Sequence, residues 1–408
     1  MVDSSIETKL NHHLKKKEFT PGIQFVLAMT CSVAIANLFY DQVLLSSIIR
    51  DFSVLPNEAG LLLSIIQIGY TLGLLFIVPL GDRFNRRNMI LGSMLLSAFW
   101  LVLMTWVSSF VLLLIVGFLL GFSTVPAQII IPFVASNANQ EHRGKLIGQL
   151  LTGIFMGVLV GRVFGGWIGQ LFDWRAVHWT AAFILLSFTG YLFFKMPEDQ
   201  APKKSSYIVI IKSLLPLLKN EPVLRETMIL GSTAFAAFNM FWVPLTLLLH
   251  GAPYHYGSGL IGTFGIVGIA GSLAAGFTGN LSAGDRVRHW NLVALTTMIS
   301  SFILLGLGWQ SLWILIFITF ILDVGSRMNM TLNQGRLYQL DPGKHSRLNA
   351  LFMVSYYLGG SLGSFFGSLA YHLYGVMGMV LSGSIALALA ILYVFLKSAQ
   401  RATMRIHS

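Results

Sequence analysis

The chain has few charged residues, a single cysteine and none of the short motifs that bind nucleotides or metals. Only 11% of its 408 residues are charged, whereas a soluble globular domain carries about 25%. Cys31 is the only cysteine, so no intrachain disulfide can form. The sequence has no Gly-x-x-x-x-Gly-Lys-Ser/Thr loop, no His-Glu-x-x-His pair and no Gly-x-Ser-x-Gly elbow. It therefore argues against an ATP-driven pump and against an enzyme, and we expect neither a cofactor nor a bound metal.

Long apolar stretches fill most of the sequence, in which 55% of the residues are hydrophobic. A helix needs about 20 apolar residues to cross a bilayer. Stretches of this kind predict an all-α membrane protein with twelve spans, at residues 22–45, 57–80, 89–107, 110–135, 146–171, 177–195, 227–249, 258–281, 291–308, 311–335, 348–373 and 376–396.

The basic residues lie mainly on one side of the expected membrane. Alternate loops, counted from the N-terminus, hold 23 of the 27 lysines and arginines. Cytoplasmic loops are enriched in these residues, so we expect a multi-pass protein of a bacterial inner membrane with both termini in the cytoplasm. The net charge of +11 then reflects topology and not a nucleic acid partner. The expected partners are the lipid bilayer, a small-molecule solute and protons, and we expect a monomer.

A repeated pattern of glycines predicts two related halves. Gly157, Gly161 and Gly165 recur 202 residues later as Gly359, Gly363 and Gly367. Glycines four residues apart on one helix face let two backbones approach closely; such faces either pack statically or allow the halves to slide. A connector with four prolines and a Lys-Lys pair divides the chain. We therefore expect two pseudo-symmetric six-helix bundles at 1–195 and 226–408, with a cytoplasmic linker at 196–225. The linker contains either an amphipathic surface helix or a marginal thirteenth span.

The loop after the second stretch reads Gly81-Asp82-Arg83-Phe84-Asn85-Arg86-Arg87, and a shorter echo begins at Gly284. With Leu80, this loop resembles the signature turn of the major facilitator superfamily, although Val78 and Asn85 stand where the pattern has glycine. In that family the turn is thought to latch the inner side while the carrier is open outward. The resemblance implies a gating role for Asp82, Arg83, Arg86, Arg87, Asp285 and Arg286.

The resemblance is closer still to a bacterial subgroup often called arabinose-efflux-permease-like, which includes carriers that export sugars and drugs. It rests on the segments 36–42, 334–338 and 347–349, followed by the glycine pair at 359–360. Two positions depart from the antiporter branches, because Gly117 replaces an arginine and Arg162 replaces a proline. Proton antiport therefore does not follow from those two motifs.

Four charged residues fall within the predicted spans: Asp41, Arg162, Asp323 and Arg327. Ionisable residues inside a membrane are costly and often functional, so these four are candidates for ion coupling. Asp323 and Arg327 are one helical turn apart and can pair, either for coupling or only to neutralise each other. Asp41 and Arg162 reach similar depths and are expected to pair. The alternatives are that Arg162 extends to the outer interface and that Asp41 is solvated there. His178 is interpreted as a packing or interface residue and not as a proton relay.

The resemblance also implies that spans 1, 4, 7 and 10 line a central cavity. It offers Asn37, Tyr40, Gln128, Asn239, Trp242 and Gln334 as candidates for contact with a solute. We therefore expect a secondary active transporter that exports a small organic solute, such as a sugar or a drug-like molecule, in exchange for protons by alternating access. The alternatives are a gradient-driven importer or uniporter and, in another class, a membrane-embedded sensor with a carrier fold. Zwitterionic, cationic and polyol solutes all remain open.

Overall fold

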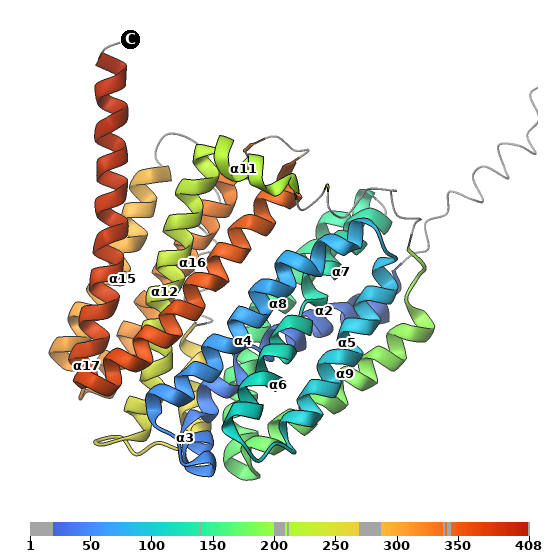
Figure 1. The fold of residues 1–408 in the computed structure, drawn as a ribbon, viewed down its shortest axis with the longest axis horizontal. Coiled ribbons are helices and arrows are strands. Elements are labelled where there is room, and N and C mark those ends of the chain that lie inside the picture. Colours follow the sequence, from blue (N-terminus) through green and yellow to red (C-terminus); the bar gives the residue numbers. More distant parts are fainter. Residues whose placement is uncertain are drawn as a thin grey trace, which may run out of the picture.

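The computed structural model describes residues 19–138, 140–199, 209, 212–268, 287–337, 339–340 and 344–406. Within these ranges the regular structure is helical, without a strand. Ten of the described helical segments are long and apolar enough to cross a membrane. The prediction of an all-α protein that crosses the membrane many times is therefore confirmed. Figure 1 shows the helices running side by side, with α3 near one end of the molecule and α11 at the other.

Two spans of the first half are each built from two helices. The apolar passage Pro21–Phe52 breaks after Ala36, and Phe110–Asn137 breaks just before Pro126. A proline at the start of a helix lacks only an N–H that would be unpaired there anyway. The elements of this half are α2 (Pro21–Ala36), α3 (Tyr40–Phe52), α4 (Pro56–Phe76), η1 (Val78–Asp82), α5 (Arg86–Met104), α6 (Phe110–Ser123), α7 (Pro126–Asn137), α8 (Gln140–Leu171) and α9 (Trp174–Lys195).

The last helix of the second half is two helices joined at Gly375, whose φ of 58° and ψ of −141° are not helical. Its apolar segment Arg347–Lys397 has 51 residues, or about 77 Å at 1.5 Å per residue, far beyond the roughly 30 Å of a bilayer core. Figure 1 shows the chain reversing within α17. The elements are α11 (Leu214–Asn220), α12 (Pro222–His250), α13 (Ser258–Thr263), α15 (Val287–Gly308), α16 (Leu312–Leu337) and α17 (His345–Ile406).

Two of the sequence predictions fall partly on residues that are not described. An apolar helix covers Ser258–Gly268, and the rest of the predicted span 258–281 lies outside the described residues. Within the predicted linker, α11 buries Leu214 and Leu217 and exposes Leu215 and Lys219. The remainder of that linker is described only at 196–199, 209, 212–213 and 221–225.

The glycine faces pack inside each half of the chain. A Cβ atom at Gly157 would collide with the backbone of α2 at Ser32, and one at Gly363 would collide with the backbone of α12 at Ala236. α8 therefore lies directly on α2, and the first arm of α17 lies directly on α12. The close approach predicted from the spacing is present. The idea that these faces slide between the halves is wrong, because each faces a helix of its own half.

Different surfaces join the two halves. α4 packs against α17, α8 packs against α13, and α3 packs against α12. In each pair, one helix comes from before the linker and the other from after it.

Candidate functional site

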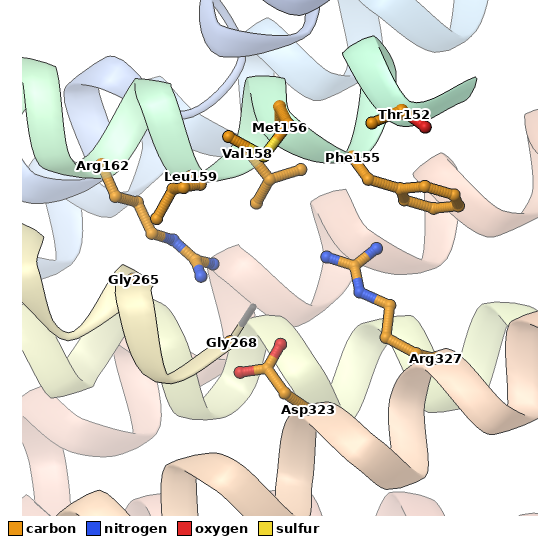
Figure 2. Close-up of a pocket in the computed structure, with 10 residues that line it drawn as sticks. All are labelled: Thr152, Phe155, Met156, Val158, Leu159, Arg162, Gly265, Gly268, Asp323 and Arg327. Carbon is orange, nitrogen blue, oxygen red and sulfur yellow. The ribbon is translucent and has the colours of Figure 1, made fainter. Parts of the chain in front are cut away.

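A cavity of about 200 Å³ lies between α8, the apolar helix Ser258–Gly268 and α16. Arg162, Asp323 and Arg327 converge on it, as Figure 2 shows. Three of the four charged residues singled out in the sequence are thus brought together from two halves of the chain. The other lining residues are apolar or small apart from one threonine: Thr152, Phe155, Met156, Val158, Leu159, Gly265 and Gly268. The described lining comes from predicted spans 5, 8 and 10, whereas the family resemblance implied spans 1, 4, 7 and 10.

Arg162 is held in place from two sides. Its side chain is only 1% exposed, and its Nε donates a hydrogen bond of 3.0 Å to Oε1 of Gln42. The guanidinium carbon lies 3.5 Å from the centroid of the Trp242 ring, and a desolvated cation–π contact of this kind contributes about 2 kcal/mol. The expected pair with Asp41 is wrong, since the partner is the next residue, Gln42. Extension of Arg162 to the outer interface is also wrong, because the side chain is buried.

Asp323 and Arg327 do not form the predicted pair one turn apart. No hydrogen bond or ion pair within 4.0 Å joins them in the described structure. Among the described residues, Oδ2 of Asp323, Nε of Arg327 and Nη2 of Arg162 are buried and have no hydrogen-bond partner. The charges of both arginines act on Asp323. The cavity therefore presents charged atoms whose hydrogen-bonding capacity is not used by the described part of the chain.

Asp41 pairs instead with His178, and both side chains are 1% exposed at a separation of 3.2 Å. The sequence interpretation of His178 as a packing residue missed this contact, and a solvated Asp41 is excluded by its burial. Nδ1 of His178 lies 3.0 Å from the carbonyl oxygen of Trp174. A carbonyl oxygen can only accept, so Nδ1 carries a proton.

This tautomer determines the charge of the pair. With Nδ1 protonated, a neutral imidazole would point the lone pair of Nε2 at a carboxylate oxygen, which is repulsive. A proton on Nε2 of His178 removes this repulsion, and the net charge of the pair is then zero. The contact is an ion pair by distance, although its alignment falls short of a good hydrogen bond.

Of the predicted solute-contacting residues, only Trp242 touches the charged cluster. Oδ1 of Asn239 accepts hydrogen bonds of 3.4 Å from Gln67 and from Ser364, so this residue joins helices. Tyr40 is buried against Phe164. The remaining candidates bond elsewhere or have no partner in the described structure: Gln128 with Tyr70 at 3.4 Å, Gln334 with Asn349 at 3.4 Å, and the buried amide of Asn37 with none.

The α4–α17 contact closes one end of the interface between the halves. The hydroxyl of Ser64 donates to the carbonyl of Ser361 at 3.0 Å, and the hydroxyl of Ser361 donates back to the carbonyl of Ser64 at 2.9 Å. Deeper along the same pair of helices, the Tyr70 and Tyr357 rings meet edge to face at 4.6 Å.

The α8–α13 contact closes the same end. The hydroxyl of Ser258 donates to the carbonyl of Gly166 at 2.9 Å, and the backbone N–H of Gly259 donates to Gln170 at 2.8 Å. This end carries the loops at 53–55 and 251–257.

The family-like turn anchors helices of the first half at the opposite end. The backbone N–H of Arg86 donates to Asp199 at 2.9 Å, and its side chain donates to Ser136 at 2.9 Å. The side chain of Arg87 donates to the carbonyl of Phe193, whereas Arg83 is exposed. The side chain of Asp82 is not described, and Asp285 and Arg286 lie outside the described residues, so their gating role stays a prediction.

A second ionic cluster at this end belongs to the other half. Glu226 at the start of α12 pairs with Arg288 of α15 at 2.9 Å and with Arg336 of α16 at 3.1 Å. Glu226 and Asp199 were not among the residues predicted from the sequence. An acidic residue close to basic loop residues was the available signal.

A family model described as the Major Facilitator Superfamily matches residues 25–309. The chain belongs to the major facilitator superfamily. The resemblance drawn from the turn and the span 1 segment is thereby confirmed.

Similar proteins of this superfamily are described as transporters. The chain is 31% identical over 377 residues to a putative uncharacterized transporter, YgaY, of Escherichia coli (strain K12), covering 92% of this chain and 94% of that protein. It is 24% identical over 388 residues to a probable sugar efflux transporter of Helicobacter pylori (strain P12), covering 91% and 93%.

Solved structures of the superfamily share the fold. A bacterial homologue of the human lysosomal transporter Spinster superposes with a TM-score of 0.76 at 14% identity, over 93% of this chain and 97% of that one. A D-xylose–proton symporter superposes with a TM-score of 0.71 at 15% identity, over 91% and 96%.

Proposed function

We propose that the protein is a secondary active transporter that exports a small organic solute by proton-coupled alternating access. Twelve spans would form two six-helix bundles, at 1–195 and 226–408, joined by the linker 196–225. Ten described segments are long and apolar enough to cross a membrane, and one of them is α17. Counting the two arms of α17 separately would give eleven spans. The partly described span 258–281 would be the twelfth. The names of the relatives described as sugar efflux transporters support export.

The observation that carries this proposal is a charged cavity at an interface that is closed at one end. Arg162 comes from one half and Asp323 and Arg327 from the other, so relative movement of the halves changes the cavity. The closed end lies next to Ser53, on the side with few basic residues. With basic loops in the cytoplasm, the closed end faces outward and the other end is the one through which a solute enters from the cell.

The orientation has its own test. In a Cys31→Ala background, Ser53→Cys should react with an impermeant thiol reagent added to whole cells, and Asn88→Cys should not. Both positions are exposed in the structure, so a difference in labelling reports the side of the membrane. Labelling of Asn88→Cys alone would reverse the orientation and the assignment of the closed end.

Asp323 is the proposed proton site, because its carboxylate faces the cavity and its Oδ2 has no hydrogen-bond partner among the described residues. Exchange requires a solute that competes with the proton on Asp323, as a cation would. The charges of the cavity favour a second candidate, in which solute and proton move together. Protonation of Asp323 removes the only negative charge among the three charged lining residues, which strengthens binding of an anion.

Flux into reconstituted vesicles under an imposed pH gradient of either sign tests the proposal. One sign of gradient should drive accumulation, and Asp323→Asn should abolish that accumulation while counterflow of the solute remains. The exposed Arg50→Gln serves as a control that should behave like the parent protein. If Asp323→Asn combined with Arg327→Gln restored gradient-driven flux, Asp323 would be only a counter-charge. No response to any gradient by the folded parent protein would refute secondary transport.

A further inference from the structure

We propose that the solute carries a carboxylate or a similar single negative charge, bound between the guanidinium groups of Arg162 and Arg327. This inference rests on the second candidate of the proposed function, in which solute and proton move together, and it specifies the substrate class of that transport. Sequence alone left zwitterionic, cationic and polyol solutes open. The geometry and charge of the cavity point instead to an anion, a class outside these three.

A count of the charges in the spans gives the cavity a surplus of one positive charge. Asp41 and protonated His178 lie 3.2 Å apart and cancel each other's charge. Arg162 and Arg327 then contribute two positive charges and Asp323 one negative charge, which leaves +1. The stretch 269–284, which follows the neighbouring helix in the sequence, contains no charged residue. A buried surplus charge is costly without a counter-ion, so the cavity favours an anion.

The hydrogen-bonding groups agree with this count. Nη2 of Arg162 and Nε of Arg327 are buried donors without a partner in the described structure, and Figure 2 shows both guanidinium groups directed into the cavity. Guanidinium groups present planar sets of donors that match a carboxylate. Gln42 and Trp242 already fix Arg162, so little side-chain freedom remains to be lost when an anion binds.

The walls indicate a small solute with an apolar or ring-shaped body. The guanidinium of Arg327 lies 5.7 Å from the Phe155 ring and 6.0 Å from the Phe238 ring. The volume of about 200 Å³ is below the roughly 300–1,000 Å³ of pockets that take drug-sized ligands. A small organic acid fits this description better than a large cationic drug.

Two series of compounds, each with a neutral, an acidic and an amine member on a similar scaffold, test this assignment. Binding to the purified full-length protein is measured by calorimetry at constant pH and ionic strength with glucose, glucuronate and glucosamine, and with benzyl alcohol, benzoate and benzylamine. The carboxylate of at least one series should bind at least about tenfold more tightly than its neutral and amine counterparts, as expected for a charge-assisted hydrogen bond. Arg327→Gln should remove that advantage, and Arg50→Gln should preserve it.

Asp323→Asn distinguishes an anion site from the other classes, because it raises the surplus charge from one to two. Carboxylate binding should then become tighter, whereas an amine or a zwitterion held by Asp323 would bind more weakly. Arg162→Gln should also remove the advantage of the carboxylate, and its thermal unfolding is measured to show that this variant folds. Carboxylates that bind no better than their counterparts in both series, or a loss of binding in Asp323→Asn, would overturn the anion assignment.

The two proposals can fail separately. Gradient-driven flux of glucose or glucosamine, without a preference for glucuronate, would leave the transport function standing and remove the anion class. Tight binding of a carboxylate, without flux under any gradient, would support the anion site and refute secondary transport.

Discussion

The hydrogen bond between Gln42 and Arg162 should appear as a coupling energy in a double-mutant cycle. Gln42→Leu alone leaves the Nε of a buried guanidinium without an acceptor, and Arg162→Met alone leaves a buried amide oxygen without a donor. The double change replaces both partners by apolar groups of similar size, which is far less costly. A hydrogen bond to a charged group is worth about 1.5–3 kcal/mol, and the 3.0 Å contact between two fully buried side chains falls in this class. We therefore expect a coupling of about 1.5–3 kcal/mol.

The control cycle pairs Arg162→Met with Asp41→Asn. Asp41 contacts His178, so the effects of these two changes should add to within about 0.5 kcal/mol. The assay is denaturant unfolding of the purified protein in detergent, followed by near-ultraviolet circular dichroism. A coupling below about 0.5 kcal/mol in the first cycle, or a larger coupling in the control cycle, would refute the assignment of Gln42 as the partner.

Three further predictions follow from other contacts. Ser64→Cys with Ser361→Cys, in a background without Cys31, should crosslink under oxidant and stop transport until a reductant is added; undiminished flux in the crosslinked protein would show that this end need not open. Glu226→Gln should lower the unfolding free energy by about 2–4 kcal/mol, because two partly buried guanidinium groups lose their counter-charge, and an unchanged unfolding curve would contradict this. His178→Phe should destabilise the protein, and Asp41→Asn in the same chain should recover most of the loss if the two residues pair.

Sequence patterns predicted the helices and the central charges well. Apolar length alone located the spans, because a bilayer core requires about 20 apolar residues per crossing. The cost of charge in lipid singled out Arg162, Asp323 and Arg327, and the structure brings these three to one cavity. Glycine spacing correctly predicted close helix contacts. The glycine spacing did not identify the helix that packs against each glycine face, because any apolar helix can pack closely on such a face.

The partners of the buried charges were predicted poorly, and geometry explains why. Depth along a span placed Arg162 level with residues 41 and 42. Neighbouring residues on a helix point about 100° apart, so depth does not decide which of the two faces the arginine. Asp41 and His178 are in contact but lie far apart in the sequence, so no local sequence pattern predicts their pairing. For Asp323 and Arg327, a spacing of four residues permits a pair without requiring one.

Distances across the interface at both ends test alternating access most directly. Spin labels at Phe172→Cys and Tyr374→Cys report the closed end, where both native side chains are at least 70% exposed. Labels at the exposed positions Asn88→Cys and Asn220→Cys report the opposite end, all in a Cys31→Ala background. On adding a transported solute at acid pH, the distance at the closed end should lengthen while the distance at the opposite end shortens. Distances that stay fixed at both ends, or lengthen together, would contradict a carrier that exposes its charged cavity to one side at a time.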